Sequence, residues 1–108
     1  VIVEFDVDQH FIHSEYMAEL DFLIEEIQHT SGYKIMIAGH TDSEGNAAYN
    51  HALGQKRAFE IQTYLIGKGI NSFNIQTISY GEARPKRNNE QAVGKAKNRR
   101  AEVQVIYN

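Results

Sequence analysis

The sequence of 108 residues contains no cysteine and a single proline. No apolar run approaches the roughly 18 residues that a membrane-spanning helix needs. The lack of cysteine excludes a disulfide framework, a thiolate nucleophile and a cysteine-based zinc site, although it fits a reducing as well as an oxidising compartment. The chain begins at Val1, and no basic segment followed by a hydrophobic one opens it. We therefore expect an excised or processed domain whose targeting signals lie outside it.

Charge is unevenly distributed along the chain. Residues 1–60 hold 11 acidic and 3 basic residues, whereas residues 61–108 hold 3 acidic and 8 basic ones. A basic second half would suit nucleic acid, but it has few aromatic rings to stack on bases and the net charge is −3. We expect no nucleic-acid binding. The hydrophobic fraction of 42% and the length predict a single folded domain over residues 1–108.

Hydrophobic periodicity predicts strands that alternate with helices. Strands are expected at residues 1–5, 33–38, 74–80 and 101–107, with amphipathic helices from Ser14 to just before Gly32 and over 47–67, and a short helix near 92–97. Ser14 is the expected N-cap of the first helix, and Gly39 is expected to end the second strand. The order β-α-β-α-β-(α)-β predicts an α/β two-layer sandwich with the helices on one face of the sheet.

The second long helix contains one anomalous charge. Its residues at steps of four form an expected inward stripe, consisting of Tyr49, Leu53, Arg57, Ile61 and Leu65. Arg57 interrupts this stripe, and Asn50 lies two turns earlier on nearly the same side. A buried guanidinium is expected to need a carboxylate partner. From the pattern alone, Arg57 either pairs internally with Asp42 or Glu44, extends to water, or faces a ligand.

A second candidate feature is the sequence His40-Thr41-Asp42, which lies between a strand end and a helix start. At this position in an α/β layer, exposed backbone N–H groups and the positive end of the helix favour an anion. Asp42 and Arg57 would together suit a zwitterion, whose ammonium would face the carboxylate and whose carboxylate would face the guanidinium. The simpler alternative is that Asp42 only caps the following helix.

Metal and enzyme patterns are weak. His10 and His13 are spaced HxxH near two aspartates, but no third ligand pattern follows. The run that begins at Asp42 has Leu53 where a calcium loop needs a bidentate glutamate. The chain contains no GxSxG motif, phosphate-binding loop or GxGxxG motif. We expect no metal, no cofactor and no catalytic residue.

Three separated runs, GHTDSEGNAAYNHALGQKRAFEIQTYLIGKGI (39–70), ISYGEARP (78–85) and NRRAEV (98–103), closely resemble the OmpA-like domain. This is the peptidoglycan-binding domain of peptidoglycan-associated lipoproteins, OmpA proteins and flagellar stator MotB proteins. The opening residues 3–6 resemble the first strand of the family, so the resemblance covers nearly the whole chain. The lipoprotein subgroup is the most similar, from the GH-x-D and YN-x-x-LG-x-x-RA stretches.

The resemblance implies a four-stranded mixed sheet and a non-catalytic domain that binds the diaminopimelate of the cell-wall stem peptide. Asp42 and Arg57 would hold the amine and carboxylate of diaminopimelate. Asn50, Leu53 and Arg99 would line the same pocket, and loop residues near Phe5 and Asp6 would close it. The domain would be a fragment of a longer envelope protein in the periplasm, attached to the outer membrane through segments outside this chain.

The sequence departs from the family between Asp6 and the first helix, where the connection is about two residues longer and contains His10 and His13. These histidines either tune binding near pH 6 or are solvated loop residues. One alternative function is a protein–protein interaction module of an envelope complex, such as a secretion system or flagellar stator. Its surface would be the basic region 84–100 together with the acidic first helix. A cell-wall hydrolase is a third hypothesis, which the missing catalytic motifs disfavour.

Overall fold

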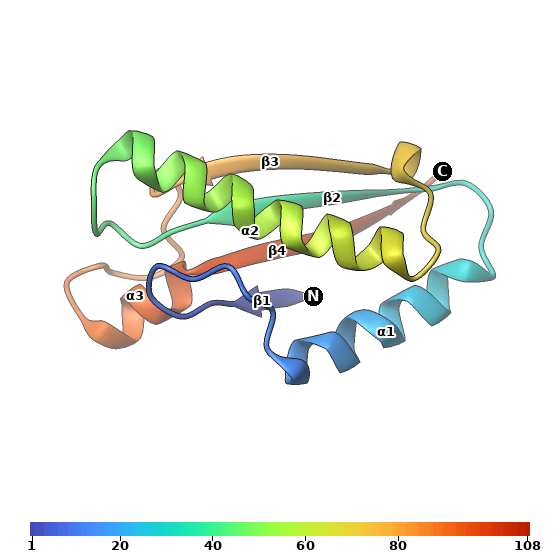
Figure 1. Cartoon of the computed structure of the whole chain (residues 1–108), viewed down its shortest axis with the longest axis horizontal. Coiled ribbons are helices and arrows are strands. Elements are labelled where there is room, and N and C mark those ends of the chain that lie inside the picture. Colours follow the sequence, from blue (N-terminus) through green and yellow to red (C-terminus); the bar gives the residue numbers. More distant parts are fainter.

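The computed structural model describes residues 1–108 and contains a four-stranded sheet with two long helices packed across one face (Figure 1). The elements are β1 (Ile2–Glu4), α1 (Ser14–Gln28), β2 (Tyr33–His40), α2 (Ala47–Gly67), a single 3-10 turn η1 (Ser72–Asn74), β3 (Ile75–Gly81), α3 (Ala92–Asn98) and β4 (Arg100–Tyr107). This architecture confirms the predicted α/β sandwich. None of the helices is long and apolar enough to cross a membrane.

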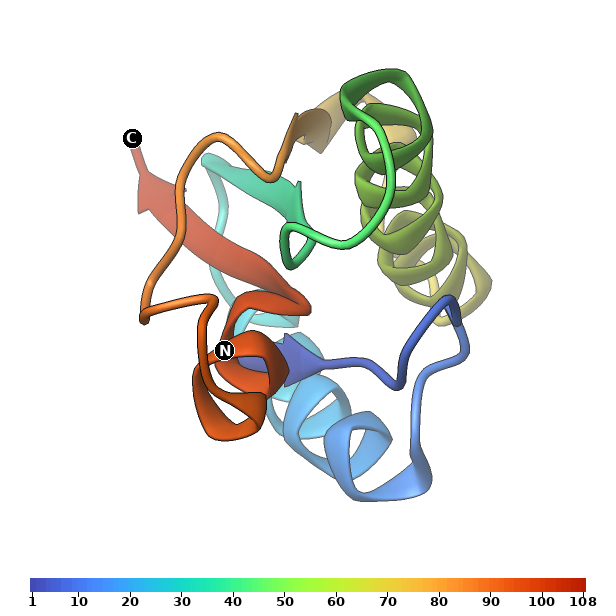
Figure 2. The same ribbon diagram turned by 90° about the vertical axis from the view of Figure 1, so that its left-hand side faces the viewer.

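The sheet is mixed, with the strand order β1-β4-β2-β3. Strand β4 runs antiparallel to both β1 and β2, whereas β2 and β3 are parallel. The carboxyl ends of β2 and β3 and the start of β4 therefore meet at one end of the sheet, where His40 lies opposite Gly81 and Gly39 lies opposite Ala101. Figure 2 looks onto this end, and shows the loops after β1 and β2 beside α3.

The core lies between the sheet and the two long helices. Its buried side chains come from every strand and from α1 and α2, and include Val3, Leu20, Ile24, Ile27, Ile35, Ile37, Ile61, Leu65, Ile75 and Val103. The α1 members recur at three- and four-residue steps, so their burial confirms the predicted amphipathic face. Apolar burial of this kind is the main favourable contribution to folding.

Two local predictions were wrong. The N-cap of α1 is His13, not Ser14, and it makes no side-chain capping bond because its ring Nε2 lies instead 3.0 Å from an Asp6 carboxylate oxygen. Strand β2 does not end at Gly39, which stays paired with Ser79, and pairing continues to His40. Gly39 does not end the strand; it lies within β2 at a point where another backbone approaches closely.

That packing brings α2 against β2 backbone to backbone. A Cβ atom at Gly39 would lie 1.8 Å from the carbonyl oxygen of Gly54. A Cβ atom at Gly54 would lie 2.3 Å from the hydroxyl of Ser79. The two glycines therefore set how closely the helix lies on the sheet, and with it the position of the α2 N-terminus at the end shown in Figure 2.

Candidate functional site

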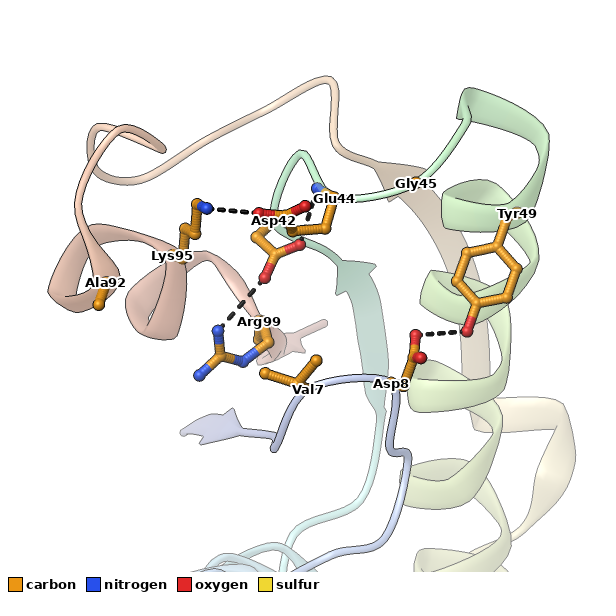
Figure 3. Close-up of a pocket in the computed structure, with 9 residues that line it drawn as sticks. All are labelled: Val7, Asp8, Asp42, Glu44, Gly45, Tyr49, Ala92, Lys95 and Arg99. Carbon is orange, nitrogen blue, oxygen red and sulfur yellow. Dashed lines mark hydrogen bonds and ion pairs between the residues drawn. The ribbon is translucent and has the colours of Figure 1, made fainter.

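A pocket of about 670 Å³ opens at the end of the sheet where β2 and β3 finish (Figure 3). Four segments supply its walls: the loop after β1, the loop after β2, the first turn of α2, and α3. The lining residues are Val7, Asp8, Asp42, Glu44, Gly45, Tyr49, Ala92, Lys95 and Arg99. Because these segments are far apart in the sequence, the pocket exists only in the folded chain.

Asp42 and Arg99 form an ion pair on one wall of the pocket. The Arg99 Nη1 lies 3.2 Å from Asp42 Oδ2, and Arg99 Nε donates to the Phe5 carbonyl at 2.9 Å. The other Asp42 oxygen accepts from the Glu44 amide at 3.0 Å. Both charged side chains are therefore held in fixed orientations. The alternative that Asp42 caps α2 is wrong, because Asn46 is the N-cap.

A second ion pair crosses the pocket mouth between Lys95 of α3 and Glu44 of the β2–α2 loop (Figure 3). Their hydrogen bond lowers the pKa of Glu44 and raises the pKa of Lys95, so both are charged at neutral pH. Lys95 lies in α3 and Arg99 is the C-cap residue that follows it, and both line the pocket. The pocket thus presents two cations, each next to a carboxylate.

The opposite wall is formed by Tyr49 and Asp8, joined by a 2.5 Å hydrogen bond from the tyrosine hydroxyl (Figure 3). Asp8 has a backbone φ of 60°, which non-glycine residues seldom adopt. Tyr49 is 45% exposed, so its predicted inward position was wrong. Each step of four residues turns the side chain by about 40° around the helix axis. Tyr49, at the start of the stripe, therefore lies on a different side of α2 from the buried residues at its other end.

Arg57 is completely buried and binds backbone, not carboxylates. Its Nε donates to the Gln9 carbonyl at 2.9 Å, and its Nη2 donates to the Asp6 carbonyl at 3.1 Å. Its Nη1 donates to the His40 carbonyl at 2.9 Å, and the guanidinium lies 5.2 Å from the centre of the Phe5 ring. One side chain therefore ties the loop after β1 to the end of β2.

Burial lowers the pKa of Arg57 to about 10, although nearby Asp42 opposes the shift, and the group stays charged at neutral pH. The predicted internal pairing with Asp42 or Glu44 is not found, since the partner of Asp42 is Arg99 and that of Glu44 is Lys95. Arg57 lies behind the pocket lining rather than in it. Its direct contact with a ligand stays a prediction, and it requires the loop carbonyls to withdraw.

The other predicted site residues surround the pocket without lining it. Asn50 is buried and donates to a Glu82 carboxylate oxygen at 2.9 Å, which links α2 to the loop after β3. Leu53 is buried one turn further along α2. Phe5 and Asp6 line a separate hollow of about 200 Å³ that shares Arg99 with the main pocket. Of the seven predicted site residues, Asp42 and Arg99 therefore line the pocket together, and the other five lie around it.

The sequence did not predict that Asp8 and Lys95 line the pocket. It also did not predict that Asn98 holds the loop before α3 in place. Lys95 was not singled out, because Arg99 follows the predicted helix, so helical spacing does not relate the two. Asp8 had no usable signal, because its position depends on the loop path. Asn98 is fully buried, and its Oδ1 accepts from the amides of Lys86 and Arg87, so it fixes the loop that precedes α3.

The loop histidines are partly exposed, as the solvated alternative predicted, and each also contacts a carboxylate. His10 Nδ1 lies 3.1 Å from a Glu60 oxygen, and His13 Nε2 lies 3.0 Å from an Asp6 oxygen. No group of three or more His, Asp or Glu side chains is arranged to hold a metal ion. The His10 contact joins the longer loop to α2, and the His13 contact joins the end of the loop to its start at Asp6.

His40 is buried at the end of β2, and neither of its ring nitrogens has a hydrogen-bond partner. Its ring stacks on Tyr80, with 5.4 Å between centroids. Burial lowers the pKa of His40 to about 4, with Arg100 and Arg84 acting in the same direction and Glu102 against it. The imidazole is therefore neutral at pH 7.

We expect the folded state to lose stability as the pH falls from about 6.5 to about 4. In this window the unfolded chain protonates His40 and the folded chain does not, so protons favour unfolding by up to about 3 kcal/mol. Urea unfolding of the wild type and of His40→Gln at pH 7 and pH 4.5 measures the effect. The wild type should lose more stability than the variant. Equal losses would contradict the assigned pKa.

A family model described as the OmpA family matches residues 4–99. The chain belongs to this family, and it is a domain of the kind that peptidoglycan-associated lipoproteins contain. It is 40% identical to the peptidoglycan-associated lipoprotein of Buchnera aphidicola over 94% of its length, and 38% identical to that of Haemophilus influenzae over 92%. The chain spans 58% and 65% of these two relatives.

A solved structure supports the same assignment. The fold matches the crystal structure of the peptidoglycan-associated lipoprotein from Burkholderia pseudomallei with a TM-score of 0.93 and 30% identity. The match covers 97% of this chain and 89% of the other. The relatives named above are all named as peptidoglycan-associated lipoproteins, in agreement with the predicted class of domain.

Proposed function

We propose that this domain anchors a larger envelope protein to the cell wall by binding the diaminopimelate of the peptidoglycan stem peptide. The observation that carries the proposal is the Asp42–Arg99 pair, with opposite charges 3.2 Å apart on the wall of a 670 Å³ pocket. The free end of the diaminopimelate side chain carries an ammonium and a carboxylate on one carbon. A site with one anion and one cation side by side matches that group.

In the proposed complex, the ligand ammonium approaches Asp42 and the ligand carboxylate approaches Arg99. Lys95 of α3 adds a second positive charge to the pocket lining. Arg57 contributes from behind, because its charge is buried close to Asp42 and it holds the carbonyls of the loop after β1. Asn50, Leu53, Phe5 and Asp6 support the walls. The names of the two curated relatives support peptidoglycan as the partner.

The full-length protein would then lie in the periplasm, attached to the outer membrane by segments outside this chain. Wall binding needs no chemistry beyond recognition, so no cofactor and no metal are required. Because a polymer presents many identical stem peptides, weak binding at each one gives firm retention when many copies of the anchor act together.

Asp42→Asn should reduce co-sedimentation with purified sacculi at least about tenfold, because it removes a charge-assisted contact that contributes roughly 1.5–3 kcal/mol. The asparagine keeps an oxygen to accept from the Glu44 amide, but its NH2 group replaces the oxygen that accepts from Arg99, so the melting temperature should fall and sedimentation is measured well below it. Glu25→Gln, the same kind of change on an exposed position of α1, should sediment like the wild type.

Wild-type sedimentation by both Asp42→Asn and Arg99→Gln would rule out the proposed pocket. If a variant that no longer sediments still supports assembly of an envelope complex in cells, the protein–protein alternative is favoured instead. Release of soluble muropeptides from sacculi during incubation would revive the hydrolase hypothesis.

A further inference from the structure

A second hollow, of about 320 Å³, lies on the outer side of α2 beside the longer loop. It is lined by His10, Gln55, Lys56, Phe59 and Glu60. The Phe59 ring is 58% exposed. At the rim, His10 stacks on the exposed ring of Phe11 with 5.5 Å between centroids. Phe59 of α2 and His10 of the longer loop therefore line one depression, and Phe11 packs behind His10 without lining it.

The chemistry of this hollow suits a sugar ring. Phe59 offers an apolar surface, and the surrounding groups are an amide, an ammonium, a carboxylate and an imidazole. The charges of Lys56 and Glu60 are opposite, so the hollow selects neither an anion nor a cation. A pyranose has one face of C–H groups and a rim of hydroxyls that both donate and accept hydrogen bonds. Concave sites with an apolar base and a few polar groups hold such ligands.

The longer loop connects this hollow to the pocket described above. Asp8 bonds to Tyr49, Gln9 accepts from Arg57, and His10 contacts Glu60, so consecutive loop residues are fastened along α2. Tyr49 and Glu60 are eleven residues apart on one helix, a rise of roughly 16 Å. Three extended stem-peptide residues span about 10–11 Å, and their linkage to the sugar adds further length. The diaminopimelate side chain, which points to Asp42 and Arg99, and the linkage to the sugar must supply the remaining length for one glycopeptide to reach both places.

We propose that the Phe59 hollow is a saccharide subsite that binds an N-acetylated sugar ring of the glycan strand while the stem peptide occupies the Asp42 pocket. This inference rests on the proposed function and adds the glycan to the ligand it recognises. The two sites together would select peptide that is still attached to the wall over free peptide fragments.

The test compares two ligands by calorimetry and by NMR titration of the 108-residue chain. One is a diaminopimelate-containing tripeptide, and the other is the same tripeptide attached to N-acetylmuramic acid. The muramyl tripeptide should bind the wild type more tightly and should shift amides at residues 55–60 that the bare tripeptide leaves unchanged. Phe59→Ala should weaken binding of the muramyl tripeptide roughly three- to tenfold and leave the bare tripeptide unaffected.

Phe73→Ala is the matched control, because its ring is 91% exposed on η1, away from both sites. Equal affinity of Phe59→Ala and the wild type for the muramyl tripeptide would overturn the subsite while leaving the proposed function intact. A hollow that serves a protein partner would give that same result. If the wild type binds neither ligand, the proposed function fails, and the subsite fails with it.

Discussion

Gly39→Ala should destabilise this chain by at least about 4 kcal/mol, enough to leave much of it unfolded at 37 °C. The added methyl carbon would lie 1.8 Å from the Gly54 carbonyl oxygen and 2.6 Å from its carbon. Both are backbone atoms in the middle of α2, so neither can turn aside as a side chain can. Relief requires the helix to lift from the sheet, which opens the core beneath it.

Two other glycines provide matched comparisons for thermal and urea unfolding. At Gly54 the nearest atom is the Ser79 hydroxyl at 2.3 Å, which would lose its bonds to the His51 carbonyl and the Gly81 amide, and the nearest backbone atom is 3.0 Å away; Gly54→Ala should therefore cost less than Gly39→Ala. At Gly67 nothing lies within 4 Å, and alanine there should be neutral or slightly stabilising. A Gly39→Ala protein with the wild-type melting temperature would contradict the close helix–sheet contact.

The second large effect is expected at Arg57. Arg57→Ala should lower the free energy of unfolding by about 3 kcal/mol or more, because the Gln9, Asp6 and His40 carbonyls lose their donor together and a cavity remains. For a chain of this size the melting temperature should fall by roughly 12 °C or more. Amides of the loop after β1 should exchange faster, since its main connection to β2 is gone.

Arg57→Lys separates support from ligand contact. A lysine keeps the charge but lacks the planar fork, so it cannot donate to three carbonyls at once. We expect loss of stability together with loss of sacculus binding, the pattern of a positioning residue. Unchanged stability with lost binding would instead indicate that the guanidinium meets the ligand itself. Lys56→Ala, at the exposed neighbouring position, should change the free energy of unfolding by no more than about 0.5 kcal/mol.

Helices and strands could be predicted where hydrophobic residues recur at a regular spacing within one segment. The α1 face of Leu20, Ile24 and Ile27 is such a case, and its burial follows from spacing alone. Gly39 shows the limit of local signals, because the same residue type ends strands and permits close packing. Only the helix lying across it decides between the two, and that helix is distant in the sequence.

The site was predictable in part for a related reason. Asp42 was predicted from its place between a strand and a helix, whereas Arg99 came only from the family resemblance, since 56 intervening residues leave no spacing rule to join the two. The partners of Arg57 could not be predicted, because backbone carbonyls carry no sequence signature. Asp8 likewise depends on a left-handed backbone turn, with φ of 60°, that a non-glycine residue seldom takes.

The Asp42–Arg99 contact has a consequence for how an anchor of this kind would behave. In the empty pocket each charge already neutralises the other, so an arriving zwitterion exchanges partners instead of finding them vacant. The net gain is then the difference between two similar sets of contacts, and release needs no large barrier because the internal pair re-forms behind the departing ligand. Each domain would therefore bind and release stem peptides repeatedly. Many copies of the anchor together would stay attached to the cell wall while it is cut and rebuilt.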